Sequence, residues 1–164
     1  MTNGGAPIPP RSRPHSKPID TTGLKTCDIA ITPACIAALY KIPPGDKANP
    51  DNVMGIFEEG DFYSQEDLNL FFKNFTPKIP QGTHPKPAFI DGAMAPVPVN
   101  QAGGESDLDF ELAYPIIWPQ NTVLYQTDDI LYATGQAPNN GGFNTFLDAI
   151  DGVSSIDKRF VVSC

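Results

Sequence analysis

The chain has 164 residues, which favours a single domain, and carries a formal net charge of −8 at pH 7. This acidic balance argues against a nucleic-acid binder, which needs clustered lysine and arginine, and no stretch approaches the roughly 20 apolar residues of a membrane span. Prolines (18) and glycines (14) are abundant, so much of this dissolved, globular chain is expected to be loop.

The first 26 residues are predicted to be a disordered linker, because five prolines and scattered polar residues cannot bury enough apolar surface. They have no basic start and no apolar core of a secretory signal. Ordered structure is expected to begin at Thr32, which can cap a helix whose first residue is Pro33. Ile36, Leu39 and Tyr40 fall on one stripe of that helix, which the prolines at 43–44 end.

Strands and helices are predicted to alternate from there on. The apolar run 52–57 suits a strand buried on both faces, and Ser64 begins a helix with apolar residues at helical spacing up to Phe75. Strands are expected at 88–91 and 121–126, and helices at 105–113 and 143–150. The order predicts an α/β fold, with a small, mainly parallel sheet covered by helices on both faces.

Two carboxylates four residues apart stand out in the helix that follows Gly103 and Gly104. Glu105 and Asp109 share one face, with Leu108, Leu112 and Ala113 expected to pack inward. Buried together, the pair would share a proton and act as a general base with its orienting partner. Acidic residues in a first helical turn are also typical of a solvated face, and spacing alone does not decide between the two.

Two interpretations of the cysteines Cys27 and Cys35 remain open. Cys27 and Cys35 would close a short loop under oxidising conditions, or would serve as two small apolar residues in a reducing cell, while Cys164 has no evident partner. The residues 74–76, Asn-Phe-Thr followed by proline, form an N-glycosylation sequon, a short motif that often occurs by chance.

Four stretches in register resemble the sedolisin, or serine-carboxyl peptidase, family, in its fungal tripeptidyl-peptidase and aorsin-like branch. They are residues 27–43, residues 53–57 with 63–68, residues 90–92, and residues 104–116. The match runs from about Cys27 to about Gly152, so the resemblance divides the chain into a linker or propeptide junction (1–26), the N-terminal part of a peptidase domain (27–152) and a divergent tail (153–164).

The resemblance implies an incomplete subtilisin-like fold and assigns roles to the acidic pair. Glu105 would be the general base towards a serine, and Asp109 would orient it. A histidine, with a pKa of about 6.5, is protonated at pH 4, whereas a glutamate at about 4.3 is still partly ionised. Asp107 and Glu111 do not match the family motif and are interpreted as surface charges.

The family's nucleophile lies in a Gly-Thr-Ser-x-x-x-Pro motif that this sequence lacks, since Ser154 and Ser155 stand in a different context. The chain is therefore expected to be inactive alone, and the resemblance implies that the family's oxyanion aspartate also lies beyond residue 164. It is expected to be poorly soluble, because half of a sheet exposes an edge strand and apolar helix faces. No cofactor is expected, because the family's calcium site should lie beyond residue 164 as well. The resemblance implies peptide or protein substrates and an extracellular or vacuolar location, with no nucleic acid or membrane partner. Two alternatives remain: a non-catalytic binding module derived from the peptidase fold, and an unrelated small α/β domain.

Overall fold

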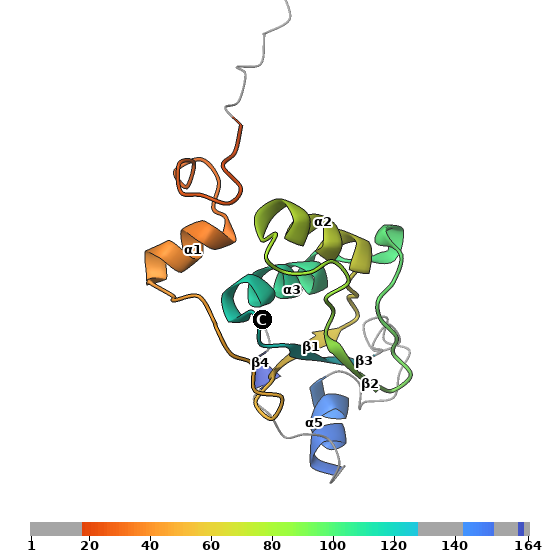
Figure 1. Cartoon of the computed structure of the whole chain (residues 1–164). Helices are drawn as coiled ribbons and strands as arrows, with labels where there is room; N and C mark the ends of the chain where they lie inside the picture. Colours follow the sequence, from red (N-terminus) through yellow and green to blue (C-terminus); the bar gives the residue numbers. More distant parts are fainter. Residues whose placement is uncertain (1–17, 128–142, 153–160, 163–164) are drawn as a thin grey trace, which may run out of the picture.

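The computed structural model describes residues 18–127, 143–152 and 161–162. Helices and strands alternate along most of the described chain (Figure 1). The elements are α1 (Pro33–Tyr40), β1 (Met54–Glu59), α2 (Gln65–Phe75), β2 (Lys86–Ile90), the 3-10 helix η1 (Val99–Gln101), α3 (Gly104–Ile117), β3 (Thr122–Thr127), α5 (Phe143–Gly152) and β4 (Val161–Val162).

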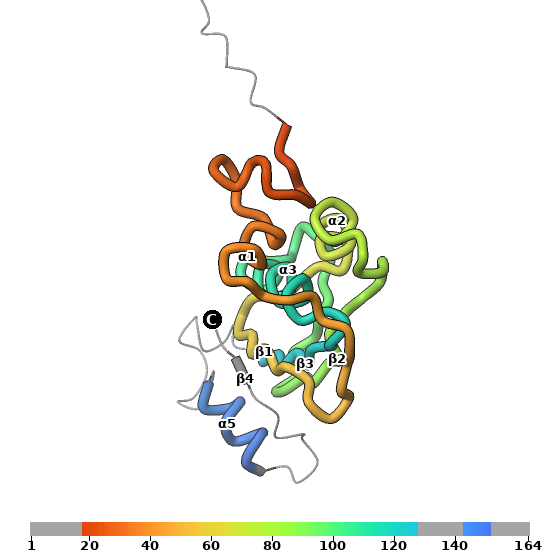
Figure 2. Tube along the Cα trace, turned by 60° about the vertical axis from the view of Figure 1, so that its left-hand side comes forward, coloured from red at the N-terminus to blue at the C-terminus, as the bar shows by residue number. Residues whose placement is uncertain are grey.

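The strands form one parallel sheet in the order β2-β3-β1-β4. Its main body is the three strands β2, β3 and β1, and β4 adds two residues at the β1 edge. Figures 1 and 2 both place α5 on one side of the strands and α2 and α3 on the other. The predicted α/β class, with a mainly parallel sheet flanked by helices, is confirmed.

The sheet separates two apolar cores, because successive side chains of a strand point to opposite faces. Ile56 and Leu124 point towards α2 and α3, whereas Phe57, Val123 and Tyr125 point towards α5. On the first side the strands pack against four side chains of the two helices, each 0% exposed: Leu68, Phe72, Phe110 and Tyr114. On the other side Phe146 of α5 lies 4.7 Å from Phe57 between ring centroids.

The predicted starts of α1 and α2 are confirmed, and each helix begins with a capping side chain. The Thr32 hydroxyl accepts from the backbone N–H of Cys35, and the Ser64 hydroxyl accepts from the N–H of Asp67. Each interaction satisfies a backbone donor that the first helical turn leaves unpaired. These local contacts explain why α1 and α2 begin where the sequence predicts.

The predicted inward face of α3 is wrong for Leu108, whereas Ala113 packs against the core as expected. Leu108 is 45% exposed, and the side chains buried along the helix are Ser106, Phe110 and Tyr114. Tyr63, from the loop after β1, packs edge-on against Phe110 with 5.1 Å between ring centroids. Tyr114 packs edge-on against Phe72 of α2 in the same core, so the aromatic side of α3 is buried and the Leu108 side points outward.

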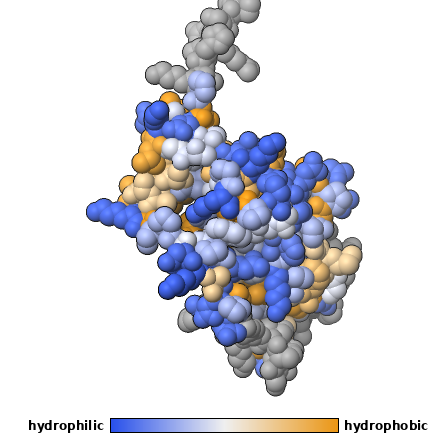
Figure 3. Space-filling model, viewed as in Figure 1, coloured by the Kyte–Doolittle hydropathy of each residue, from blue (hydrophilic) through white to orange (hydrophobic). Residues whose placement is uncertain are grey.

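The predicted stripe of α1 is also wrong, because Leu39 and Tyr40 are 73% and 71% exposed. Only Pro33 and Cys35 of this helix are buried. Figure 3 shows apolar colour over this helix and the loop before it. The exposed apolar side chains of this region are Leu24, Ile29, Ile31, Leu39 and Tyr40.

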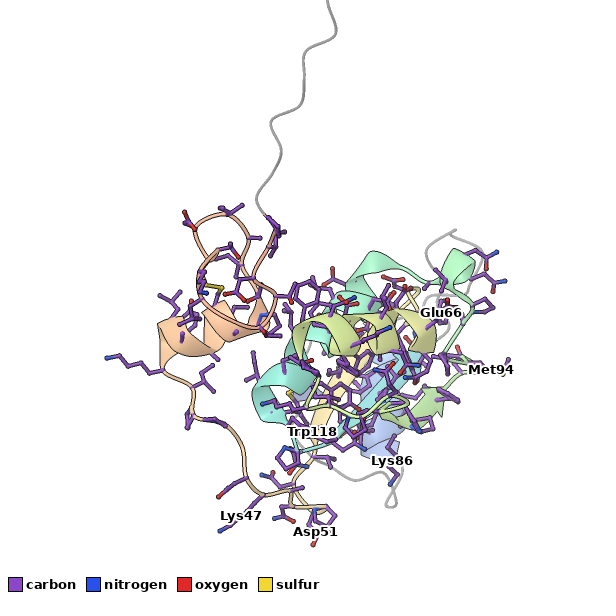
Figure 4. All side chains as sticks on the ribbon, turned by 45° about the horizontal axis from the view of Figure 1, so that its top comes forward. Lys47, Asp51, Glu66, Lys86, Met94 and Trp118 are labelled. Carbon is purple, nitrogen blue, oxygen red and sulfur yellow. A yellow bond between two sulfur atoms is a disulfide. The ribbon has the colours of Figure 1, made fainter. Side chains whose placement is uncertain are left out.

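Cys27 and Cys35 form a disulfide beside α1 (Figure 4), which selects the oxidised alternative. Ordered structure also starts before Thr32. The carboxylate of Asp20 accepts from the N–H groups of Gly23 and Lys25. Residues 18–26 therefore contain a hydrogen-bonded loop, and only residues 1–17 of the predicted linker lie outside the described residues.

None of the described helices has the length and apolar character needed to cross a membrane. Ser154, Ser155 and Cys164 lie outside the described residues, as does the predicted tail 153–164 except for β4.

Candidate active site

The first turn of α3 is held by the loop that follows β1. Asp61 accepts hydrogen bonds from the backbone N–H groups of Glu105 and Ser106, at 2.9 and 3.2 Å. Asp61 thus caps α3 from 44 residues away, where Gly103 offers no side-chain cap of its own. A Cβ on Gly103 would collide with the Asp61 carboxylate and force it out of its capping position.

Glu58 is the buried carboxyl group of the site. It is the fifth residue of β1 and shares the sheet face of Ile56, which looks towards α3. Its side chain is 3% exposed and is hydrogen-bonded to the carboxyl group of Asp109. Its backbone is fixed by β3, because Gln126 stands opposite in the register and both the Gln126 amide and the Thr127 hydroxyl donate to the Glu58 carbonyl oxygen.

Glu105 and Asp109 both approach Glu58 from α3, as the helical spacing predicts. Glu105 is exposed at the start of the helix, and Asp109 is half-buried one turn further on. Together with Glu58 they form a series of carboxyl groups running from solvent into the protein. We call Glu58, Asp61, Glu105 and Asp109 the carboxyl cluster.

The carboxyl cluster forces Glu58 to keep its proton. Burial is the largest of the effects that together raise the pKa of Glu58 to about 8, and the charge and hydrogen bond of Asp109 and the charges of Asp61 and Glu105 act in the same direction. Glu58 is therefore neutral at acidic pH, and its O–H donates to Asp109.

Asp107 and Glu111 are both half-buried, so the prediction that they are surface charges is wrong. Asp107 accepts a hydrogen bond from the backbone N–H of Ser64, at 2.8 Å. Burial, together with the charges of Asp67 and Asp61, raises the pKa of Asp107 to about 6 against the lowering effect of that hydrogen bond. Burial and the charges of Asp107 and Asp67 raise the pKa of Glu111 to about 7. The interpretation failed because α2 packs over this side of α3.

The carboxyl cluster lies at the carboxyl ends of β1 and β3, the edge of a parallel sheet at which α/β proteins bind ligands. Within residues 18–127, 143–152 and 161–162, no group of histidine, cysteine and acidic side chains is arranged to hold a metal ion. The chemistry that the arrangement supports is proton transfer through adjacent carboxyl groups.

Sequence reasoning missed Glu58, Asp61 and Gln126. The predicted strand ended at Phe57, one residue too early to include Glu58. Continuing the two-residue alternation from Ile56 would have placed Glu58 on the face that looks towards α3. Asp61 left no comparable signal, because it caps a helix far along the chain.

Three relatives match most of the chain. Aorsin of Aspergillus oryzae is 66% identical over 137 residues, which cover 81% of this chain and 20% of that protein. A tripeptidyl-peptidase of Aspergillus fumigatus is 57% identical over 152 residues, covering 90% of this chain and 23% of that protein. This chain belongs to the sedolisin family of fungal peptidases. The alternative of an unrelated α/β domain is wrong.

A tripeptidyl-peptidase of Arthroderma otae is 38% identical over 139 residues, which are 82% of this sedolisin chain and 20% of the relative. The chain thus spans about a fifth of the length of the curated relatives that it matches. No family model matches it, and no solved structure matches it.

Proposed function

We propose that this chain supplies the proton-handling part of a secreted, acid-acting serine-carboxyl peptidase that cleaves peptides in the manner of a tripeptidyl-peptidase. The observation that carries the proposal is the hydrogen-bonded pair of Glu58 and Asp109, beneath the exposed Glu105. The printed names of the relatives support peptide cleavage. In the whole protein the parallel sheet would continue into a subtilisin-like domain.

In this proposal Glu105 is the general base. Its carboxylate takes the proton from the hydroxyl of a serine as the serine oxygen attacks the peptide carbonyl carbon, and it later returns the proton to the leaving amine. Asp109 accepts a hydrogen bond from protonated Glu105 and so orients it. Glu58 is a positioning residue, because its neutral O–H occupies one Asp109 oxygen and directs the other towards Glu105.

The serine would come from another part of the longer protein. Two serines lie near the carboxyl cluster, and neither is suited to attack a substrate. Ser64 is 1% exposed and caps α2, whereas Ser106 is 0% exposed in the first turn of α3. A nucleophile must reach a substrate carbonyl group from solvent, which a fully buried hydroxyl cannot do.

Kinetics of the full-length peptidase that carries this chain test the proposal. Glu105→Gln should lower kcat by about 10²–10⁴-fold, the usual contribution of a positioned general base. Glu66→Gln is the matched control, since Glu66 is an exposed glutamate in the first turn of α2 and should leave kcat unchanged. Full activity of Glu105→Gln would contradict the proposal. So would peptide cleavage by the 164-residue chain alone that is lost when one of its own serines is replaced.

A further inference from the structure

We propose that Asn74 carries an N-linked oligosaccharide, added in the secretory compartment before α2 folds. The inference rests on the extracellular destination in the proposed function, and on no part of the catalytic mechanism. Residues 74–76 are the only Asn-x-Ser/Thr triplet in the sequence, and the central residue, Phe75, is not proline. This is the pattern to which oligosaccharides are transferred in secreted proteins.

Asn74 is placed where a large polar group can be attached. It is the penultimate residue of α2 and is exposed, while the buried face of the helix is formed by Leu68 and Phe72. Its side-chain nitrogen donates to the carbonyl oxygen of Leu70 in the same helix, at 2.9 Å. Glycosylation replaces one hydrogen on that nitrogen, so the remaining N–H can keep the bond.

Thr76 gives the second, independent observation. It is 8% exposed, and within the described part of the chain its hydroxyl oxygen has no hydrogen-bonding partner. A buried polar group without a partner costs about 1–3 kcal/mol, so the fold alone would favour valine here, which has the same shape. Glycosylation of the unfolded chain explains why a hydroxyl is present, because the sequon needs threonine or serine two residues after the asparagine.

The burial of Thr76 also fixes the order of events. In the folded chain Asn74 lies in a helical turn and Thr76 is buried. The enzyme that transfers the oligosaccharide therefore cannot bind both side chains at the same time. Transfer must precede folding of α2. The nitrogen of Asn74 then bonds to the anomeric carbon of a lipid-linked oligosaccharide, the bond from that carbon to the diphosphate breaks, and the amide gives up one proton.

Two further features fit a glycan at this place. The disulfide between Cys27 and Cys35 indicates the oxidising compartment in which such transfer occurs. Leu70 is 57% exposed and stands four residues before Asn74, on the same side of α2. The first sugar would lie over this apolar side chain and shield it from water.

The test uses the full-length protein secreted from a fungal host, purified with its disulfide intact. Trimming with an endoglycosidase should leave one N-acetylglucosamine on the peptide that contains Asn74, detected by mass spectrometry. Asn74→Gln and Thr76→Val should both lose this sugar completely, and Thr76→Ser should retain it. An unmodified Asn74 in the secreted protein would overturn the inference.

Failure of this inference is distinguishable from failure of the proposed function. Glu105→Gln should carry the same glycan while losing peptide cleavage, and Asn74→Gln should cleave peptides at the rate of the unchanged protein. If Asn74 is unmodified and Glu105→Gln is inactive, the glycan proposal is refuted and the proposed mechanism is not. If Asn74 carries the glycan and Glu105→Gln is active, the proposed mechanism is refuted and the glycan proposal is not.

Discussion

Replacing Glu58 with glutamine should change how stability depends on pH. Glutamine keeps the shape of a protonated glutamate and can donate from its amide to Asp109, but it cannot ionise. In the native chain, burial and the neighbouring carboxylates raise the pKa of Glu58, so the folded state holds a proton that the unfolded state releases. Stability must therefore fall as the pH rises between the unfolded and the folded pKa.

The structure sets the size of the effect. The pKa of Glu58 is about 8 in the folded chain, against 4.5 for an ordinary glutamate. One pKa unit corresponds to about 1.4 kcal/mol, which gives an upper limit of about 5 kcal/mol lost between pH 4.5 and pH 8. Water that reaches the ionised carboxylate at the sheet edge will reduce this figure. The contribution of Glu58 is complete below pH 4.5, and Glu58→Gln removes its dependence on pH.

Urea unfolding at pH 4.5, 6 and 8 measures the effect, with the fluorescence of Trp118 as the probe. Trp118 is the single tryptophan and packs against the core beside α2 and α3 (Figure 4). The free energy of unfolding of Glu58→Gln should rise relative to that of the unchanged chain as the pH increases. Glu66→Gln, at an exposed position, should follow the unchanged chain. Parallel curves for Glu58→Gln and the unchanged chain would refute the reasoning.

Two further predictions concern the supports of the site. Gly103→Ala should displace Asp61 and remove the cap of α3, which lowers the free energy of unfolding by about 1–2 kcal/mol. Gly104→Ala is the control, because a Cβ at this position meets nothing within 4 Å. It should be neutral or raise the free energy of unfolding by up to about 1 kcal/mol. Equal effects of the two alanines in urea unfolding would contradict this account. Replacing Cys27 and Cys35 with serine opens a loop closed over a sequence separation of 8 and should lower the free energy of unfolding by about 2–3 kcal/mol. The loss should appear as faster proteolysis around α1, and an unchanged rate of proteolysis would contradict the prediction.

Much of the fold was predictable because its signals are local. A capping hydroxyl at Ser64, an apolar run along β1 and proline at the first turn of α1 each act within a few residues, whatever the rest of the chain does. Alternation of such segments is enough to predict a parallel sheet with helices on both faces. The spacing of Glu105 and Asp109 on one helix face is local in the same sense.

The local sequence is enough to predict that a helix follows the glycines at 103–104 and that Glu105 and Asp109 share a face of it. Packing in three dimensions decided which face of α3 is buried, because the Leu108 side and the side of Phe110 and Tyr114 both have helical periodicity, and contacts with residues distant in sequence, such as Tyr63 and Phe72, distinguish them. It also decided that Glu58 joins the carboxyl cluster. Its strand and α3 are far apart in sequence, and a pKa is set by the burial and the charges that meet in space.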